Sequence, residues 1–68
     1  MNEEVLNTSL RKFLKTVGVT SQREIEKAIR DAVTSGRIKG NEALKARMVL
    51  TIDDVGLNHA IDSTIELE

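Results

Sequence analysis

His59 and Ser63 are the side chains of this sequence that come closest to forming a catalytic pair. His59 is the only imidazole, and Ser63 follows it four residues later on the same face of a predicted strand. A nucleophile and its base must lie within hydrogen-bond reach, whereas four residues of a strand span about 13 Å. We therefore expect no catalytic residue and no enzyme activity. His59 is expected to be a half-buried structural residue with a backbone or carboxylate partner.

Two further segments contain residue types that bind ions or phosphate groups. Asp53 and Asp54 could hold a hard cation, but the alternating oxygen ligands of a calcium loop are absent, and turn formation explains both residues. The segment "SGRIKGN", residues 35–41, lacks the Gly-Lys-Ser/Thr ending of a phosphate-binding loop. We expect a solvated loop there, and neither a metal nor a cofactor in the protein.

The composition is that of one small folded domain, spanning residues 1–68. Apolar residues make up 40% of the chain and charged residues 31%, and there is no cysteine. No apolar run approaches the length of a membrane span. The first residues, "MNEEVLN", are acidic where a secretion signal would be basic. We expect a soluble cytoplasmic protein that does not bind membranes.

Charge is distributed unevenly along the chain. All ten Lys and Arg residues lie between Arg11 and Arg47, whereas five acids and no basic residue follow Met48. Either basic helices and an acidic hairpin balance each other within one fold, or a basic surface meets an anionic partner. The candidate contacts to such a partner are Arg11, Lys12, Lys15, Arg23, Lys27, Arg30, Arg37 and Lys39.

The first half of the chain has helical periodicity. Apolar residues recur every three or four positions over residues 3–17 and again over residues 21–35. Gly18 is suited to end a first helix. Ser21 and Glu24 have the spacing of a capping box that begins a second one, and Gly36 is the expected end of that helix.

The second half alternates apolar and polar residues, as a strand with one covered face does. The alternation runs over residues 43–53, is interrupted by the turn-forming segment "DDVG", and resumes over residues 57–67. The two strands should form a hairpin. Both apolar sets share a face only if Ile52 lies opposite Leu57, because a shift of one residue would expose one set. The same register places Arg47 beside Asp62.

These patterns predict an α+β fold: two amphipathic helices, about 3–17 and 21–35, followed by a β-hairpin, about 43–53 and 57–67, that packs on them. A two-stranded sheet leaves both edges unpaired, and edge strands pair readily with another chain. A homodimer built through the hairpin is therefore one prediction. A monomer in which the hairpin covers the two helices fits the same alternation.

The segment "FLKTVGVTSQREI" is weakly similar to a helix-turn-helix motif, with the hairpin in the place of a wing. The expected second helix, however, has as many acids as basic residues, and binding to duplex DNA needs several phosphate contacts. Phe13 is also the only aromatic residue, whereas modules that bind RNA or single strands usually stack bases on aromatic rings.

Three segments carry a resemblance to a known group of proteins: "RKFLKTVGVTSQREIEKAIRDAV", "SGRIKGNEALKA" and "VLTIDDVGLNHAIDSTIEL". Through them the chain resembles a family of short, uncharacterised bacterial proteins of about 70 residues, a domain of unknown function. The resemblance implies a bacterial, single-domain protein. It implies no activity and assigns no functional residue.

Two functional hypotheses follow. The first is a small protein-interaction module, with an unknown protein or a second copy of itself as partner. The alternative is an accessory nucleic-acid-binding protein that uses the basic residues of the helices and of the loop after them.

Overall fold

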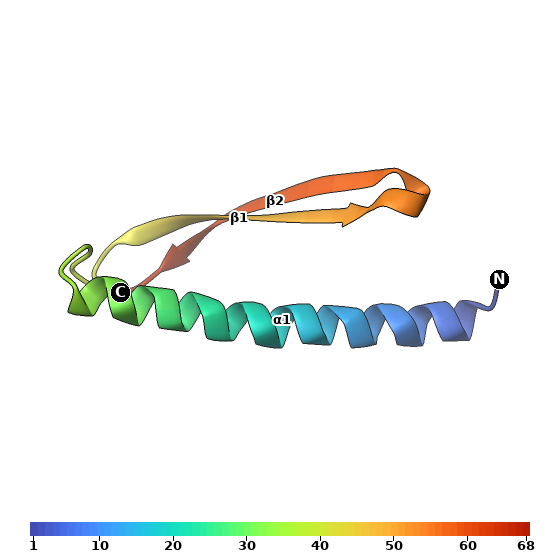
Figure 1. Ribbon diagram of the computed structural model, residues 1–68, viewed down its shortest axis with the longest axis horizontal. Coiled ribbons are helices and arrows are strands. Elements are labelled where there is room, and N and C mark those ends of the chain that lie inside the picture. The colour runs from blue at the N-terminus through green and yellow to red at the C-terminus, as the bar shows by residue number, and fades with distance from the viewer. The chain divides into compact units, whose positions relative to one another are not determined.

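The computed structural model describes all 68 residues and divides into two compact units, residues 1–37 and 38–68. The first unit contains one helix, α1 (Glu3–Thr34). The second contains β1 (Ala43–Ile52), a short 3-10 turn η1 (Asp53–Val55) and β2 (Leu57–Glu66) (Figure 1). The α+β class is thus confirmed, whereas the prediction of two helices is wrong. The packing of the hairpin on the helix stays a prediction.

The start of α1 is fixed by a side-chain cap. The Asn2 Oδ1 atom accepts hydrogen bonds from the backbone N–H groups of Glu4, at 3.0 Å, and Val5, at 3.2 Å. These donors have no partner within the helix, so the cap stabilises its first turn. Glu3 and Glu4 place negative charge at the positive end of the helix dipole.

The expected break near Gly18 does not occur, and α1 continues through it. Three glycines have a positive φ, and Gly18 is not one of them. Glycine within a helix costs only about 1 kcal/mol relative to alanine, and no proline is present to remove a hydrogen bond. The apolar pattern also keeps its phase from Val17 through Ser21 to Ile25. One long helix therefore keeps the same face apolar, and the Ser21–Glu24 capping box is not formed.

The end of α1 lies where Gly36 predicts it. Gly36 has a left-handed φ of 79°. Its N–H donates to the carbonyl of Val33 at 3.1 Å, and the N–H of Arg37 donates to the carbonyl of Ala32 at 2.9 Å. This pair of bonds is the Schellman motif, which satisfies carbonyls that the helix leaves free.

The loop between α1 and β1 is closed by one carboxylate. Glu42 accepts hydrogen bonds from the backbone N–H groups of Lys39 and Gly40, both at 2.8 Å, and of Asn41, at 3.1 Å. These bonds favour the ionised form, so they hold the pKa of Glu42 below its usual value, with the Lys39 and Gly40 amides as the largest causes. Residues 35–41 therefore form an ordered turn with no free amide cradle for a phosphate.

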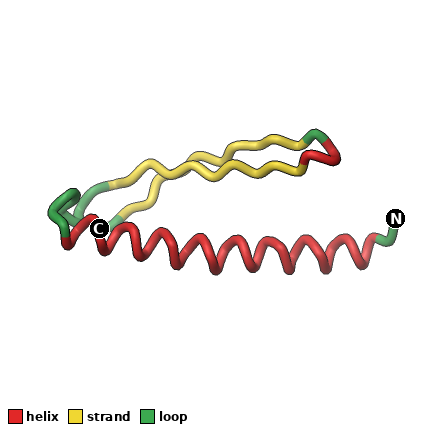
Figure 2. Tube along the Cα trace, in the orientation of Figure 1, coloured by secondary structure: helices red, strands yellow, loops and turns green.

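The hairpin has the predicted register. Ile52 lies opposite Leu57, Leu50 opposite His59, Met48 opposite Ile61, and Arg47 opposite Asp62. Gly56, with a φ of 65°, closes the connection by donating from its N–H to the carbonyl of Asp53 at 3.1 Å. Figure 2 shows the short helical turn at the tip of the two strands. The predicted strands, 43–53 and 57–67, are each one residue longer than those observed.

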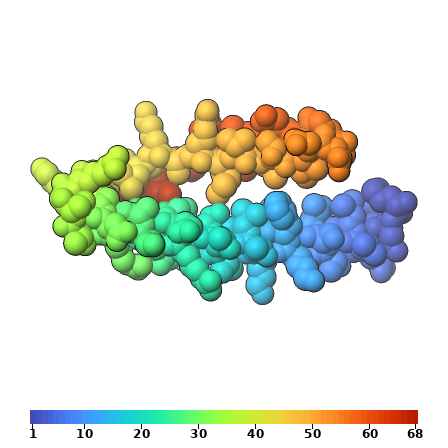
Figure 3. Space-filling model, viewed as in Figure 1, coloured from blue at the N-terminus to red at the C-terminus, as the bar shows by residue number.

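No side chain of the chain is fully buried. Thirteen large apolar side chains are exposed, among them Phe13 at 49% and Ile61 at 53%. In the space-filling view, long side chains project into solvent from both the helix and the strands (Figure 3). Each unit is a single layer of secondary structure, whereas a stable core needs two packed layers.

Candidate functional site

His59 is exposed and makes no side-chain hydrogen bond, so the expectation of a half-buried residue with a partner is wrong. The reason is that the strand face carrying His59 belongs to a unit with one layer. Ser63 lies on the same strand, β2, four residues away. No group of three or more His, Asp or Glu side chains is placed to hold a metal ion. The absence of enzyme activity stays a prediction.

A shallow hollow lies on the first turns of α1. It is lined by Glu4, Val5, Thr8, Ser9 and Lys12. All five belong to one stretch of a single helix, so the hollow has no opposite wall that could exclude water from a substrate. It is therefore an open surface and not an enclosed substrate pocket.

The eight candidate basic residues are divided between α1 and the loop after it. Arg11, Lys12, Lys15, Arg23, Lys27 and Arg30 lie on α1, and Arg37 and Lys39 follow it. At about 100° per residue, five of the six helical ones fall within an arc of about 120°, and Arg11 lies just outside. The structure therefore brings Lys12, Lys15, Arg23, Lys27 and Arg30 onto one side of the helix, over a length of about 27 Å.

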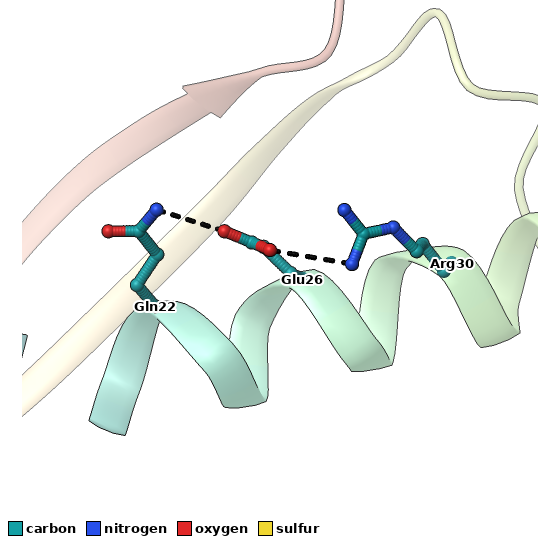
Figure 4. A network of polar contacts seen from close by, with 3 residues as sticks. All are labelled: Gln22, Glu26 and Arg30. Atoms are coloured by element: carbon teal, nitrogen blue, oxygen red, sulfur yellow. Dashed lines mark hydrogen bonds and ion pairs between the residues drawn. The ribbon is translucent and has the colours of Figure 1, made fainter. Parts of the chain in front are cut away.

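One acidic residue, Glu26, interrupts this basic side. Glu26 lies within it and forms an ion pair with Arg30, with 3.4 Å between Oε2 and Nη1 (Figure 4). Gln22 donates from its Nε2 to Glu26 Oε1 at 2.9 Å, and this bond is the largest cause that holds the pKa of Glu26 below its usual value. Arg30 lowers that pKa further. The ionised Glu26 thus offsets part of the positive charge of the basic side.

The opposite side of α1 is an apolar stripe, which we define by the residues that fall within an arc of about 160°. Its apolar members are Leu6, Leu10, Phe13, Leu14, Val17, Ile25, Ala28, Ile29 and Ala32. The same arc also contains Glu3, Asn7, Arg11, Gly18, Ser21, Glu24 and Asp31. The two apolar faces predicted for separate helices are therefore joined end to end on one helix. A lone amphipathic helix in water is stable chiefly when this face is covered.

The hairpin presents a second unpartnered surface, made of backbone groups. β1 and β2 pair only with each other, so each has one edge whose N–H and C=O groups lack a strand partner. The bidentate contact of Arg47 with Asp62, at 2.8 Å between Nε and Oδ1, links the two strands. Neither strand contains a proline to block its edge.

Sequence reasoning missed the role of Glu42. Its position two residues after Gly40 and directly before β1 is the signal in the sequence, and a carboxylate there also fits a solvated surface residue. The helix-turn-helix arrangement is wrong, because α1 contains no turn and the chain has no second helix to enter a groove.

Comparison with protein families matches residues 1–68 to the "Family of unknown function (DUF6494)". The chain belongs to this family. The match confirms the resemblance to a domain of unknown function and covers the whole sequence. No curated protein matches the chain, and no solved structure does. No helix of this DUF6494 member is both long enough and apolar enough to cross a membrane.

Proposed function

We propose that this DUF6494 protein is a small interaction module whose fold is completed by another protein chain. The observation that carries the proposal is the exposed apolar surface within each unit. Neither unit contains a buried side chain, and thirteen large apolar side chains of the chain are exposed. Extended apolar surface of this kind is typical of sites that contact another protein.

A second copy of the chain is the partner that we propose first. The unpaired edges of β1 and β2 support a dimer through the hairpin, because two exposed edges of ten-residue strands can align and complete each other's hydrogen bonds.

Sedimentation equilibrium tests the proposal. We expect a mass of at least twice 7.5 kDa for the purified protein at micromolar concentration. A monomer that unfolds cooperatively and independently of concentration would show that 68 residues complete their own fold, and the proposal would then be wrong.

The second candidate is an accessory nucleic-acid-binding protein. The clustering of five basic residues on one side of α1 favours it, since a line of positive charge about 27 Å long can follow a phosphate backbone. Fluorescence anisotropy with a labelled DNA duplex tests it. Binding that weakens steeply between low and physiological salt would support it, and no binding at low salt would exclude it.

We propose the cytoplasm of a bacterium as the setting, on the basis of the resemblance to short bacterial proteins. Fractionation of a cell that contains the protein, followed by detection with an antibody, tests this location.

A further inference from the structure

The apolar stripe of α1 has an internal symmetry that points to a partner. We propose that α1 pairs with α1 of a second copy of this chain in antiparallel orientation. This proposal rests on the proposed function, namely that another chain covers the apolar surface, and it names the partner and the geometry. The central line of the stripe is Leu6, Leu10, Phe13, Val17, Ser21, Ile25, Ala28 and Ala32.

The spacing of this line reads the same in both directions. The intervals between its members are four, three, four, four, four, three and four residues. Every position pairs with another about a common centre at residue 19, which is close to the middle of Glu3–Thr34. When two such helices lie antiparallel about a two-fold axis at this centre, each member of one line meets a member of the other at the same level. Intervals of three and four are those of a helix–helix seam.

The side chains that meet in this way differ in size. Leu6 lies at the level of the second copy's Ala32, and Leu10 at the level of its Ala28. Phe13 meets Ile25, and Val17 meets Ser21. Apart from Ile25, the larger residues thus occupy the first half of the helix and the smaller ones the second half. At three of the four levels the larger residue lies opposite a smaller one, which lets the side chains of the two helices interdigitate. In a parallel pair, Leu6 would face Leu6 while Ala32 faced Ala32, and the second half would be loosely packed.

The area suits a dimer. The stripe offers seven large apolar side chains per helix when its flanking members Leu14 and Ile29 are included. At roughly 60–100 Å² for each side chain covered, two copies bury about 800–1,400 Å², which reaches the lower end of stable interfaces. The stripe is about 39 Å long.

Charge favours the antiparallel orientation. The central line contains no Lys or Arg, and the basic side lies about 180° away, so the positive sides of the two copies point apart. The acidic first turn, Glu3 and Glu4, comes to the level of the end of the second copy's helix, close to its Arg37. The two helix dipoles also run in opposite directions, which is favourable, whereas parallel dipoles repel.

Disulfide cross-linking tests the orientation, because the chain has no cysteine of its own. The full-length variants Leu6→Cys and Ala32→Cys are mixed in equal amounts and oxidised in a glutathione buffer. In the antiparallel pair, position 6 of one chain meets position 32 of the other. Two copies of position 6 are then about 39 Å apart. We expect the mixed 6–32 dimer to exceed either like-with-like dimer at least tenfold. Thr8→Cys, on the far side of the helix, is the control and should cross-link to neither.

The outcomes separate this inference from the proposed function. Like-with-like cross-links in excess would mean a parallel pair, and a dimer by mass with no stripe cross-link would mean that something else covers the stripe. Either result overturns the antiparallel pairing and leaves the interaction module standing. A stable monomer by mass overturns both. If the reduced Leu6→Cys protein does not associate, Leu10→Cys mixed with Ala28→Cys repeats the test at an inner level of the same line.

Discussion

The helix and the hairpin differ in which of their groups lack a partner: side chains in the helix, and backbone groups in the hairpin. In α1, backbone hydrogen bonds are closed within the element, and the caps at Asn2 and Gly36 satisfy both of its ends. What the helix lacks is cover for its side chains. In the hairpin, half of the backbone groups of each strand face outward, so the strands lack partners for the backbone itself.

This difference determines what each unit can recognise. An apolar stripe selects a partner by the spacing and size of its side chains, as the symmetric line on α1 does. An open strand edge binds a partner mainly through backbone hydrogen bonds and therefore accepts many sequences. Charged side chains on the strands restrict which of these sequences bind. We therefore expect α1 to be the specific contact and the hairpin edges to be the permissive one.

The largest expected effect comes from a charge within the stripe of α1. Phe13→Glu removes the largest apolar side chain and puts a carboxylate where the second copy packs. Losing a buried phenylalanine costs about 3–5 kcal/mol, so self-association measured by sedimentation should weaken at least 100-fold. Thr8→Glu, which adds the same charge on the opposite side, is the matched control and should leave association unchanged. Equal effects of the two variants would mean that the stripe is not the contact.

In the hairpin, Gly56→Ala is expected to lower the stability most among substitutions that add a single methyl group. The Gly56 φ of 65° is left-handed, and an added Cβ would meet no atom within 4 Å. The cost of Gly56→Ala is therefore one of backbone strain alone, about 1–2 kcal/mol. Thermal unfolding followed by circular dichroism should show a lower midpoint. An unchanged midpoint would argue against a left-handed residue at the tip.

The same substitution in α1 should have the opposite sign. Gly18 lies inside the helix without a positive φ, and a Cβ there would also meet nothing within 4 Å. Gly18→Ala is expected to raise stability by about 0.5–1 kcal/mol, because alanine loses less backbone freedom than glycine on folding. A destabilised Gly18→Ala protein would instead support a helix that ends at Gly18.

The smallest effect concerns the loop between the two units. Because the pKa of Glu42 is lowered in the folded chain, its contacts stabilise the loop above the unfolded pKa of about 4.3 and are lost as pH falls through the lower folded pKa. The amide resonances of Lys39, Gly40 and Asn41 should shift together as the pH falls from about 5 to about 2, because Glu42 takes up its proton below the unfolded pKa. In Glu42→Gln this shift should be absent; its persistence would assign it to another group.

The hairpin could be predicted almost in full because its information is local and redundant. Ten alternating positions in each strand fix which face is apolar, and only one register aligns both faces. The helix was harder because Gly18 and the Ser21–Glu24 pair are genuine signals for a break. The helical hydrogen bonds and the apolar stripe both continue across residue 18, and their contributions outweigh these two signals. Both contributions add over the whole length of the helix.

The candidate site was predictable in part. The basic residues were identified from the sequence, but their gathering on one side depends on α1 being continuous, since a turn at residue 18 would have set Lys12 and Arg30 on separate helices. For the same reason the symmetric line of the stripe becomes visible only when both halves share one axis. The spacing of the apolar residues can be read from the sequence, but whether residues 3–17 and 21–35 share one helix axis cannot.

The dependence of thermal unfolding on protein concentration tests the central claim, that another copy completes the fold. Circular dichroism would be recorded over a hundredfold range of concentration. When folding and association are coupled, the midpoint rises with concentration by mass action. We predict such a rise. A midpoint that stays constant over the whole range, with a cooperative transition, would contradict the account and show that the single chain is stable with its apolar surface exposed.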